Sequence, residues 1–246
     1  MHKTTKGLVL REVKYKEADK ILTVLSQDEG KLTVKARGAL RRSSRITAAT
    51  QQLVFSEMTL FQNAGKWQLN EATTIEQFLP LRTDLSKMAL GCYFAELLEA
   101  VSDEDSPNPA VLQLGLNSLY ALSEDLCTPE QVKAVFEMRL MCLSGFEPVL
   151  TGCVACGEVH EDIRFSVRGG VLHCPGCPPG EPGQSLPLCE GSLAALRHIA
   201  SAPAKKIFSF RLEEAALRRL CDVTEAFVQM QLERGFGALD YWKTVR

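Results

Sequence analysis

The chain has 246 residues, enough for one large or two modest domains that each bury a core of their own. Hydrophobic residues make up 46% and charged residues 24%, which is ordinary for a globular protein and speaks against a disordered chain. The formal net charge is only −2, so the charge of the whole chain indicates no particular class of partner.

The charge is divided unevenly along the chain. Residues 1–80 hold 13 Lys and Arg against 8 Asp and Glu, whereas residues 81–246 hold 15 against 22. A polyanionic partner such as a nucleic acid is therefore expected to meet the N-terminal part alone.

The N-terminus is basic but has neither the apolar stretch nor the small-residue cleavage site of a secretion signal. The most apolar long segment, Met88–Val101, contains Glu96 and Glu99, which suits an amphipathic helix better than a bilayer span. We therefore expect a cytoplasmic protein with no membrane partner. Cytosolic thiols stay reduced, so clustered pairs among the nine cysteines indicate a metal site before disulfides.

The first 80 residues read as strands rich in Val, Leu, Thr and Phe, separated by turn residues such as Asp28-Glu29-Gly30 and Asn63-Ala64-Gly65. Five strands in so short a segment predict a small closed β-barrel of the OB type, although a five-stranded open sheet fits the pattern almost as well. The predicted strands are Gly7–Lys14, Lys20–Gln27, Lys31–Arg37, Leu53–Phe61 and Trp67–Phe78.

The third predicted strand alternates apolar residues with basic and polar ones, and a period of two places the basic set on one outer face. A loop with three arginines and no acid follows it. Cations spaced along a strand and a loop suit phosphate recognition. The candidate DNA-binding residues are Lys31, Lys35, Arg37, Arg41, Arg42 and Arg45. The alternative is a merely solvated strand face, and Trp67 and Phe55 are expected in the core rather than as stacking platforms.

From Leu81 onward apolar residues recur every three or four positions, which indicates helices. Residues 150–187 interrupt this pattern and are rich in Cys, Gly and Pro. The sequence therefore predicts an α+β protein, with an OB-fold domain at 1–80 and a helical domain at 81–246 that carries an insertion at about 150–187. The predicted helices are Ser86–Val101, Ala110–Ser123, Pro129–Ser144, Glu190–Ser201 and Arg211–Arg234.

The insertion contains the spacing C-x2-C-x17-C-x2-C, formed by Cys153, Cys156, Cys174 and Cys177. Two thiolates three residues apart can turn back through a knuckle and take two corners of a tetrahedron, so this spacing predicts one structural Zn²⁺. Four thiolates leave no open position for a catalytic water.

Gly157 and Gly176 are expected to give the two knuckles a permissive backbone. His160 and His173 lie nearby and could replace a cysteine, but a surface or second-shell position is the preferred interpretation. The other five cysteines are expected to be small buried hydrophobes.

The common catalytic motifs are missing from the sequence, including the phosphate-binding, zinc-protease, nucleophile-elbow and dinucleotide patterns. We therefore expect a protein that is not an enzyme.

Four segments together resemble the opening of bacterial RecO proteins: Lys6–Arg11, Glu17–Thr23, Gly30–Leu32 and Lys35–Ala39. The order of barrel, helical domain and four-cysteine insertion also matches and covers essentially the whole chain. The resemblance implies a nucleoid-associated repair protein that binds single-stranded DNA and anneals complementary strands. It also implies partnership with RecR and the single-strand-binding protein, and through them the loading of RecA. Some members of the family lack the cysteines, so zinc is expected to be a scaffold.

Two other classes stay open at this point: a zinc-containing RNA-binding or transcription-associated factor, and an adaptor whose barrel face is only solvated. If the RecO resemblance holds, the acidic, apolar-ended tail of the single-strand-binding protein needs an apolar groove with a cation. Arg139 is the candidate for that cation, on a helical pattern with Val135, Phe136, Met138 and Leu143. An arginine that is solvated or caps a helix is an equally good interpretation.

Overall fold

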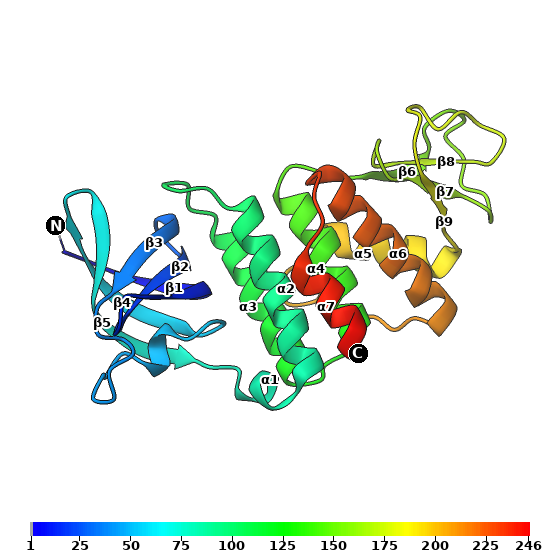
Figure 1. Ribbon diagram of the computed structural model, residues 1–246. Coiled ribbons are helices and arrows are strands. Elements are labelled where there is room, and N and C mark those ends of the chain that lie inside the picture. The colour runs from blue at the N-terminus through cyan, green and yellow to red at the C-terminus, as the bar shows by residue number, and fades with distance from the viewer. Residues whose placement is uncertain (1) are drawn as a thin grey trace. The chain divides into compact units, whose positions relative to one another are not determined.

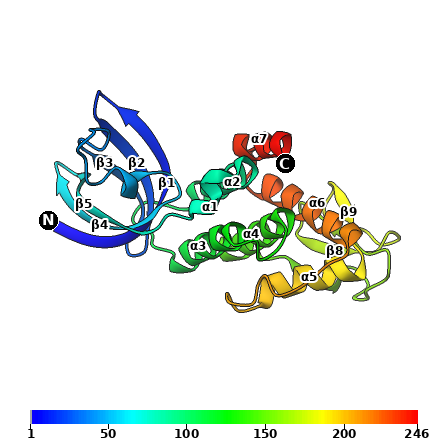
Figure 2. The ribbon, with the colours of Figure 1, turned by 90° about the horizontal axis from the view of Figure 1, so that it is seen from below.

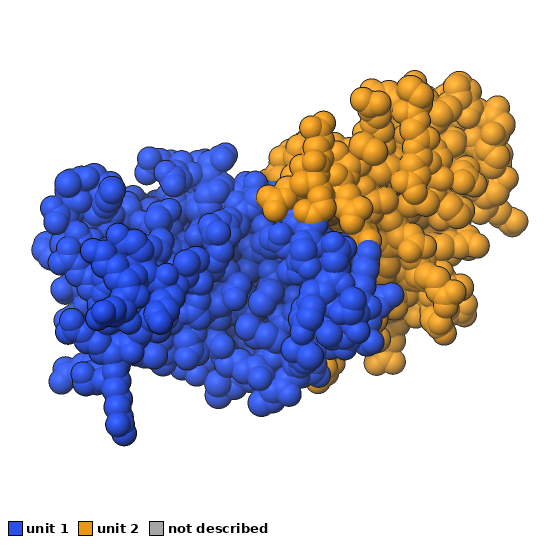
Figure 3. All heavy atoms as spheres, viewed as in Figure 1, with its two compact units in different colours: residues 1–124, 236–246 blue, residues 125–235 orange. Residues whose placement is uncertain are grey.

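The structure is a computed structural model that describes residues 2–246 (Figure 1). Its contacts divide the chain into two compact units, residues 1–124 with 236–246 and residues 125–235 (Figure 3). Among the described residues, none of the helices is both long and apolar enough to cross a membrane.

The first unit contains a closed five-stranded barrel in the order β1-β2-β3-β5-β4. β1 pairs antiparallel with both β2 and β4, and β3 pairs in parallel with β5. The predicted barrel is therefore confirmed and the open sheet is wrong. The strands are β1 (His2–Tyr15), β2 (Asp19–Ser26), β3 (Gly30–Ala36), β4 (Phe55–Asn63) and β5 (Lys66–Glu76).

β1 starts five residues before its predicted beginning, because His2 to Lys6 pair with β4 although they show little apolar alternation. Inside the barrel, buried residues from all five strands form one core, which accounts for the alternation seen on β3. Its members include Val9, Leu22, Val24, Leu32, Val34, Met58, Leu60 and Leu69.

Four helices complete the first unit: α1 (Leu79–Thr83), α2 (Leu85–Val101), α3 (Pro109–Ser123) and α7 (Gly237–Val245). α7 packs against α2, where the Trp242 indole donates to Ser86 Oγ at 3.2 Å and the Ala238 N–H donates to Glu96 at 3.1 Å. The sequence pattern does not predict α1 or α7, because both are shorter than the window in which helical periodicity can be recognised.

The second unit contains α4 (Pro129–Leu143), α5 (Glu190–Ser201) and α6 (Glu214–Gln231), which pack against one another (Figure 2). The cysteine-rich insertion between α4 and α5 forms a small sheet in the order β6-β8-β7-β9. Its strands are β6 (Val149–Cys153), β7 (Arg164–Ser166), β8 (Val171–His173) and β9 (Ser185–Pro187). Phe165 of β7 meets Phe227 of α6 edge to face, with ring centroids 5.3 Å apart, so the sheet shares a core with the helices.

The division into units differs from the domain boundary drawn after residue 80. Three helices that follow the barrel, together with α7, group with the barrel rather than with α4–α6. The sequence pattern marks where strands give way to helices, whereas the units follow which helices share a core.

A charged cluster is buried between α4 and α6. The Lys133 ammonium lies 2.9 Å from Glu137 and 2.9 Å from Glu225, and Thr224 donates to Glu137 at 2.7 Å. Burial alone would lower the pKa of Lys133, but the two carboxylates outweigh burial and raise it. Lys133 therefore stays charged inside the second unit.

Lys133→Met should destabilise the protein by about 3–5 kcal/mol, because it leaves Glu137 buried without its cation. The matched control is Arg218→Met, which removes an exposed pair of the same spacing with Glu214 and should barely change stability. The measurement is the urea midpoint of the second unit. Equal midpoints for the two variants would contradict the role given to the buried cluster.

Candidate nucleic-acid interface and metal centre

A groove of about 690 Å³ lies on the first unit, against β3 and the turn between β4 and β5. Its lining includes four cations, Lys31, Lys35, Arg37 and Lys66. Two aromatic residues, Tyr15 and Trp67, also line it, together with polar amides of the turn. Three of the six predicted DNA-binding residues are therefore brought together in one groove.

The cations of β3 differ in how far they are engaged. Lys31 Nζ donates to the Glu99 carbonyl at the end of α2, at 3.0 Å. Lys35 Nζ lies 3.1 Å from the Asp19 carboxylate and 5.0 Å from the centre of the Tyr15 ring. The N–H of Gly38 and the Lys35 ammonium both donate to Asp19 and lower its pKa, so its charge persists. Arg37 is exposed, and its side chain forms no hydrogen bond or ion pair within residues 2–246.

The other three predicted cations, Arg41, Arg42 and Arg45, stand on the loop after β3 and do not line the groove. All three are exposed, and in the described chain their guanidinium groups have neither a hydrogen bond nor an ion pair. The loop thus carries exposed arginines, whereas the groove next to it holds lysines that are partly engaged.

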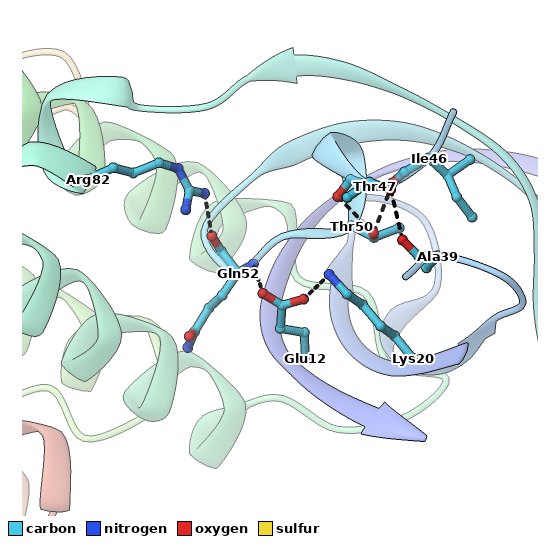
Figure 4. A network of polar contacts seen from close by, with 8 residues as sticks. All are labelled: Glu12, Lys20, Ala39, Ile46, Thr47, Thr50, Gln52 and Arg82. Carbon is cyan, nitrogen blue, oxygen red and sulfur yellow. Dashed lines mark hydrogen bonds and ion pairs between the residues drawn. The ribbon is translucent and has the colours of Figure 1, made fainter. Parts of the chain in front are cut away.

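Polar contacts close the arginine loop at its base (Figure 4). Thr47 Oγ1 donates to the Ala39 carbonyl at 2.8 Å, and Thr50 Oγ1 donates to the Ile46 carbonyl at 2.9 Å. On the N-terminal side, the Leu40 N–H donates to the Ala18 carbonyl at 2.9 Å. Hydrogen bonds therefore fix both ends of the loop, and its three arginines lie between these fixed ends.

The same network continues to the segment that leads into β4. Glu12 forms an ion pair with Lys20 and accepts from the Gln52 N–H at 3.3 Å. Arg82 then donates to the Gln52 carbonyl at 2.8 Å. These bonds hold the end of the loop segment on the barrel wall.

The second unit holds the cysteine cluster. The Sγ atoms of Cys153, Cys156, Cys174 and Cys177 all lie within 4.8 Å of one another, and those of Cys156 and Cys174 are 3.8 Å apart. Four thiolates at about 2.3 Å from a tetrahedral ion would lie about 3.8 Å from one another, so the arrangement fits a metal ion with four sulfur ligands. The predicted quartet is confirmed as one cluster.

The first knuckle depends on two glycines. Gly157 has a φ of +79°, as expected, and its N–H donates to the Cys153 carbonyl at 2.8 Å. Gly152 was not expected to matter, but a Cβ added there would lie 2.1 Å from the Gly157 carbonyl oxygen. Gly176 in the second knuckle lies outside the left-handed region, so the prediction of a permissive backbone there is wrong.

The thiols of the cluster differ in acidity. The Cys156 backbone N–H is the main group that lowers the pKa of Cys153, to about 6. Burial raises the pKa of Cys174 to about 12, and a hydrogen bond with Cys156 raises the pKa of Cys177. Four thiols this close cannot all ionise on their own, and a bound cation would favour the ionised form of each.

Comparison with known proteins places both sites in one family. The family model described as recombination protein O, N terminal, matches residues 1–78, and the C-terminal model matches residues 82–240. The chain belongs to the RecO family. DNA repair protein RecO of Acetivibrio thermocellus is 34% identical over 98% of this chain and 96% of that protein. The same protein of Symbiobacterium thermophilum is 32% identical over 98% of this chain and 96% of its own length.

Membership in the RecO family confirms the resemblance and makes this a protein of recombinational DNA repair. It disfavours the alternative of a transcription-associated factor. The two family models meet between residues 78 and 82, next to the change from strand to helix pattern. The barrel groove lies on residues of the N-terminal model together with Glu104 and Asp105, whereas the cysteine cluster lies within the C-terminal model.

The histidines near the cysteines are not part of the cluster. His173 is buried, with Nδ1 3.0 Å from the Cys174 carbonyl and Nε2 2.8 Å from Ser185 Oγ, so it joins β8 to β9 beside the sulfurs. His160 is exposed. The preferred interpretation of both is confirmed. The other five cysteines are half-buried rather than fully buried as expected.

Arg139 lies within α4 and contacts the C-terminal end of α5. Its guanidinium donates to the Ile199 carbonyl at 3.0 Å and to that of Ala200, in the last turn of α5. Its neighbours Val135 and Phe136 are fully buried, so they offer no exposed apolar groove. The contacts are those of a helix cap, and the partner-binding role of Arg139 stays a prediction.

Sequence reasoning missed several residues that line the groove, among them Tyr15, Lys66 and Gln68. Each is unremarkable in its own segment, and only the pairing of β3 with β1–β2 on one side and β5 on the other brings them together. Trp67 was expected in the core, and it does pack against the barrel core, but it also lines the groove.

Proposed function

We propose that this protein is a non-enzymatic, cytoplasmic mediator of recombinational repair that acts on single-stranded DNA at the nucleoid. In this proposal it anneals complementary strands and, with RecR, helps load RecA onto DNA coated with single-strand-binding protein. The observation that carries the proposal is the groove with four cations, beside a loop with three unpaired arginines, on a chain of the RecO family.

The groove suits a single strand. Its cations can follow a phosphate backbone, and its two aromatic residues stand among them. An adaptor with a solvated barrel face would need neither an aromatic lining nor a loop base held by three hydrogen bonds.

Annealing requires that one protein hold two strands with their bases accessible. The groove and the arginine loop both offer cations on the same barrel, and in this proposal each neutralises one backbone. Electrostatic binding on the loop leaves the bases of that strand free to pair.

Reversing the charge of Arg37, Arg41 and Arg42 together should weaken binding to single-stranded DNA strongly, since all three are exposed and form no hydrogen bond or ion pair within residues 2–246. If four or five cations each meet a phosphate, the wild-type slope of log K against log salt should be roughly −3. The matched control reverses Lys205, Lys206 and Arg218, which are equally exposed in the second unit. Titrations followed by fluorescence anisotropy at several salt concentrations measure the affinity and the salt slope of each variant. If the charge reversal on the barrel leaves the salt slope unchanged, the DNA-binding site lies elsewhere on the protein.

The metal proposed for the cysteine cluster is Zn²⁺ in a structural role. Zinc prefers four thiolates in a tetrahedron, and the cluster offers four sulfurs with no place for a reacting water. Bound there, zinc would supply cross-linking between β6 and the turn after β8, and no chemistry of its own.

We expect one tightly held zinc per chain, with an apparent binding energy on the order of 10–16 kcal/mol. Cys153→Ser and Gly152→Ala should both lose it, the first by removing a ligand and the second by pushing the Gly157 carbonyl away. Gly176→Ala is the control, because a Cβ there meets nothing within 4 Å. Elemental analysis, supported by the thiolate absorption of a Co²⁺-substituted sample, measures the outcome. A metal-free wild type would refute the assignment.

The partner surface for the acidic tail of the single-strand-binding protein needs an exposed apolar groove with a cation. In the second unit, a groove of about 660 Å³ meets this requirement better than the surroundings of Arg139 do. Phe208, Phe210 and Leu217 line it together with Arg211. Lys205 and Lys206 are exposed on the same connection between α5 and α6.

Arg211→Glu should weaken binding of a tail peptide about tenfold or more, because it replaces attraction with repulsion at the groove. Arg139→Ala should leave the peptide affinity unchanged if Arg139 only caps α5. Calorimetry with the same peptide on both variants makes the comparison. If only Arg139→Ala loses affinity for the peptide, Arg139 is the partner site after all. If the wild type does not bind the peptide, the tail is not a partner of this chain.

A further inference from the structure

The barrel groove contains a buried polar atom with no partner. Gln68 on β5 lines the groove and is only 6% exposed, and its side-chain Oε1 accepts no hydrogen bond within residues 2–246. Buried acceptors are rarely left in this state, because a lost hydrogen bond to water is then not replaced. The groove therefore presents an acceptor that a ligand with an N–H group can satisfy.

The strand register places Gln68 beside the basic face. Lys35 pairs with Gln68 across the parallel β3–β5 ladder and with Ile21 across β2, so the three side chains point to the same side. Ile21 in turn pairs with Val13, two residues before Tyr15. The Lys35 ammonium stands 5.0 Å from the Tyr15 ring centre, so Lys35 lies between the ring and the unpaired acceptor.

Tyr15 offers an aromatic ring that the core does not use. It is 41% exposed at the end of β1 and lines the groove. The ammonium groups of Lys16 and Lys35 lie 5.6 Å and 5.0 Å from its centre. An exposed ring with two ammonium groups nearby suits a nucleobase, because the base can stack on the ring while the flanking phosphates meet the ammonium groups.

We propose that the groove takes an unpaired base of single-stranded DNA, which stacks on Tyr15 and donates an N–H to Gln68 Oε1. This rests on the proposed function and deepens it, since it names the part of the strand that the groove binds. Lys35 and Arg37 then neutralise the neighbouring phosphates. In a duplex both faces of a base are covered by stacked neighbours, so the groove selects single strands.

The acidic part of the lining supports a base over a phosphate. Glu104 and Asp105 line the same groove, and their carboxylates repel phosphate but accept from base N–H groups. Together with Gln68 Oε1 they give the groove hydrogen-bond acceptors in addition to its cations. A groove built for phosphate alone has no use for such acceptors.

The test compares strands of equal length and charge that differ in their bases. Wild-type protein should bind oligothymidylate at least about fivefold more tightly than the same strand with abasic sites. Tyr15→Leu should abolish this preference and leave the abasic affinity unchanged. Oligothymidylate methylated at N3 carries a methyl group in place of the N–H donor, so the wild type should discriminate against it and Gln68→Met, which has no acceptor there, should do so much less. Quenching of Trp67 fluorescence reports binding in the groove, since the other tryptophan, Trp242, is buried.

The control variant is Tyr241→Leu, which removes a ring that is 51% exposed in the same unit but outside the groove and should change nothing. Thermal unfolding checks each variant, and if Gln68→Met fails to fold, Tyr15→Leu decides alone. Wild-type protein that binds both strands equally overturns this inference, whereas wild type that binds neither overturns the proposed function. Tighter binding of RNA than of DNA of the same sequence overturns the choice of DNA.

Discussion

The parallel pairing of β3 with β5 is the contact on which the rest of the barrel site depends. Only two partner pairs form it, Val34 with Trp67 and Lys35 with Gln68, yet they close the sheet and join segments more than thirty residues apart. Closing so long a loop has an entropy cost that the shared core must offset. Val34, at the centre of that core, is fully buried. The same pairing that completes the core sets the basic face of β3 beside Trp67 and Gln68 of β5.

The lysines of the protein differ in how readily a ligand could replace their present partners. The strength of each ion pair or hydrogen bond decides this. The pair between Lys35 and Asp19 is partly exposed, and such pairs stabilise a fold by about 0–1 kcal/mol, so a phosphate can replace the carboxylate. Lys31 donates to a carbonyl at a helix end, a contact of similar size. Lys133 is different, since it is buried together with Glu137, while its second partner, Glu225, is partly exposed.

The features that could be predicted from the sequence are those set by residues close together in the chain. Alternation on β3 and the paired C-x2-C spacing each act within a few residues, so the outward face of the strand and the four sulfurs of the cluster could be named in advance. Tyr15 and Gln68 could not, because their significance comes from strand register across the barrel. The apolar neighbours of Arg139 show the converse limit: they follow a helical period, but the period does not say whether they face a groove or a core, and Val135 and Phe136 face the core.

The small sheet that carries the cysteine cluster is too short to be stable by strand pairing alone, so a metal cross-link at this place would stabilise it. β7, β8 and β9 have three residues each, too few to form a stable sheet by pairing alone. Phe165 and Leu172 give it a small apolar contact with the helices, and Arg197 of α5 holds β6 through the Leu150 carbonyl at 2.8 Å. A metal that joins Cys153 at the end of β6 to Cys174 after β8 would cross-link the sheet where its register is irregular. Apolar packing is a poor substitute for that cross-link in this chain, because the segment is rich in Gly and Pro.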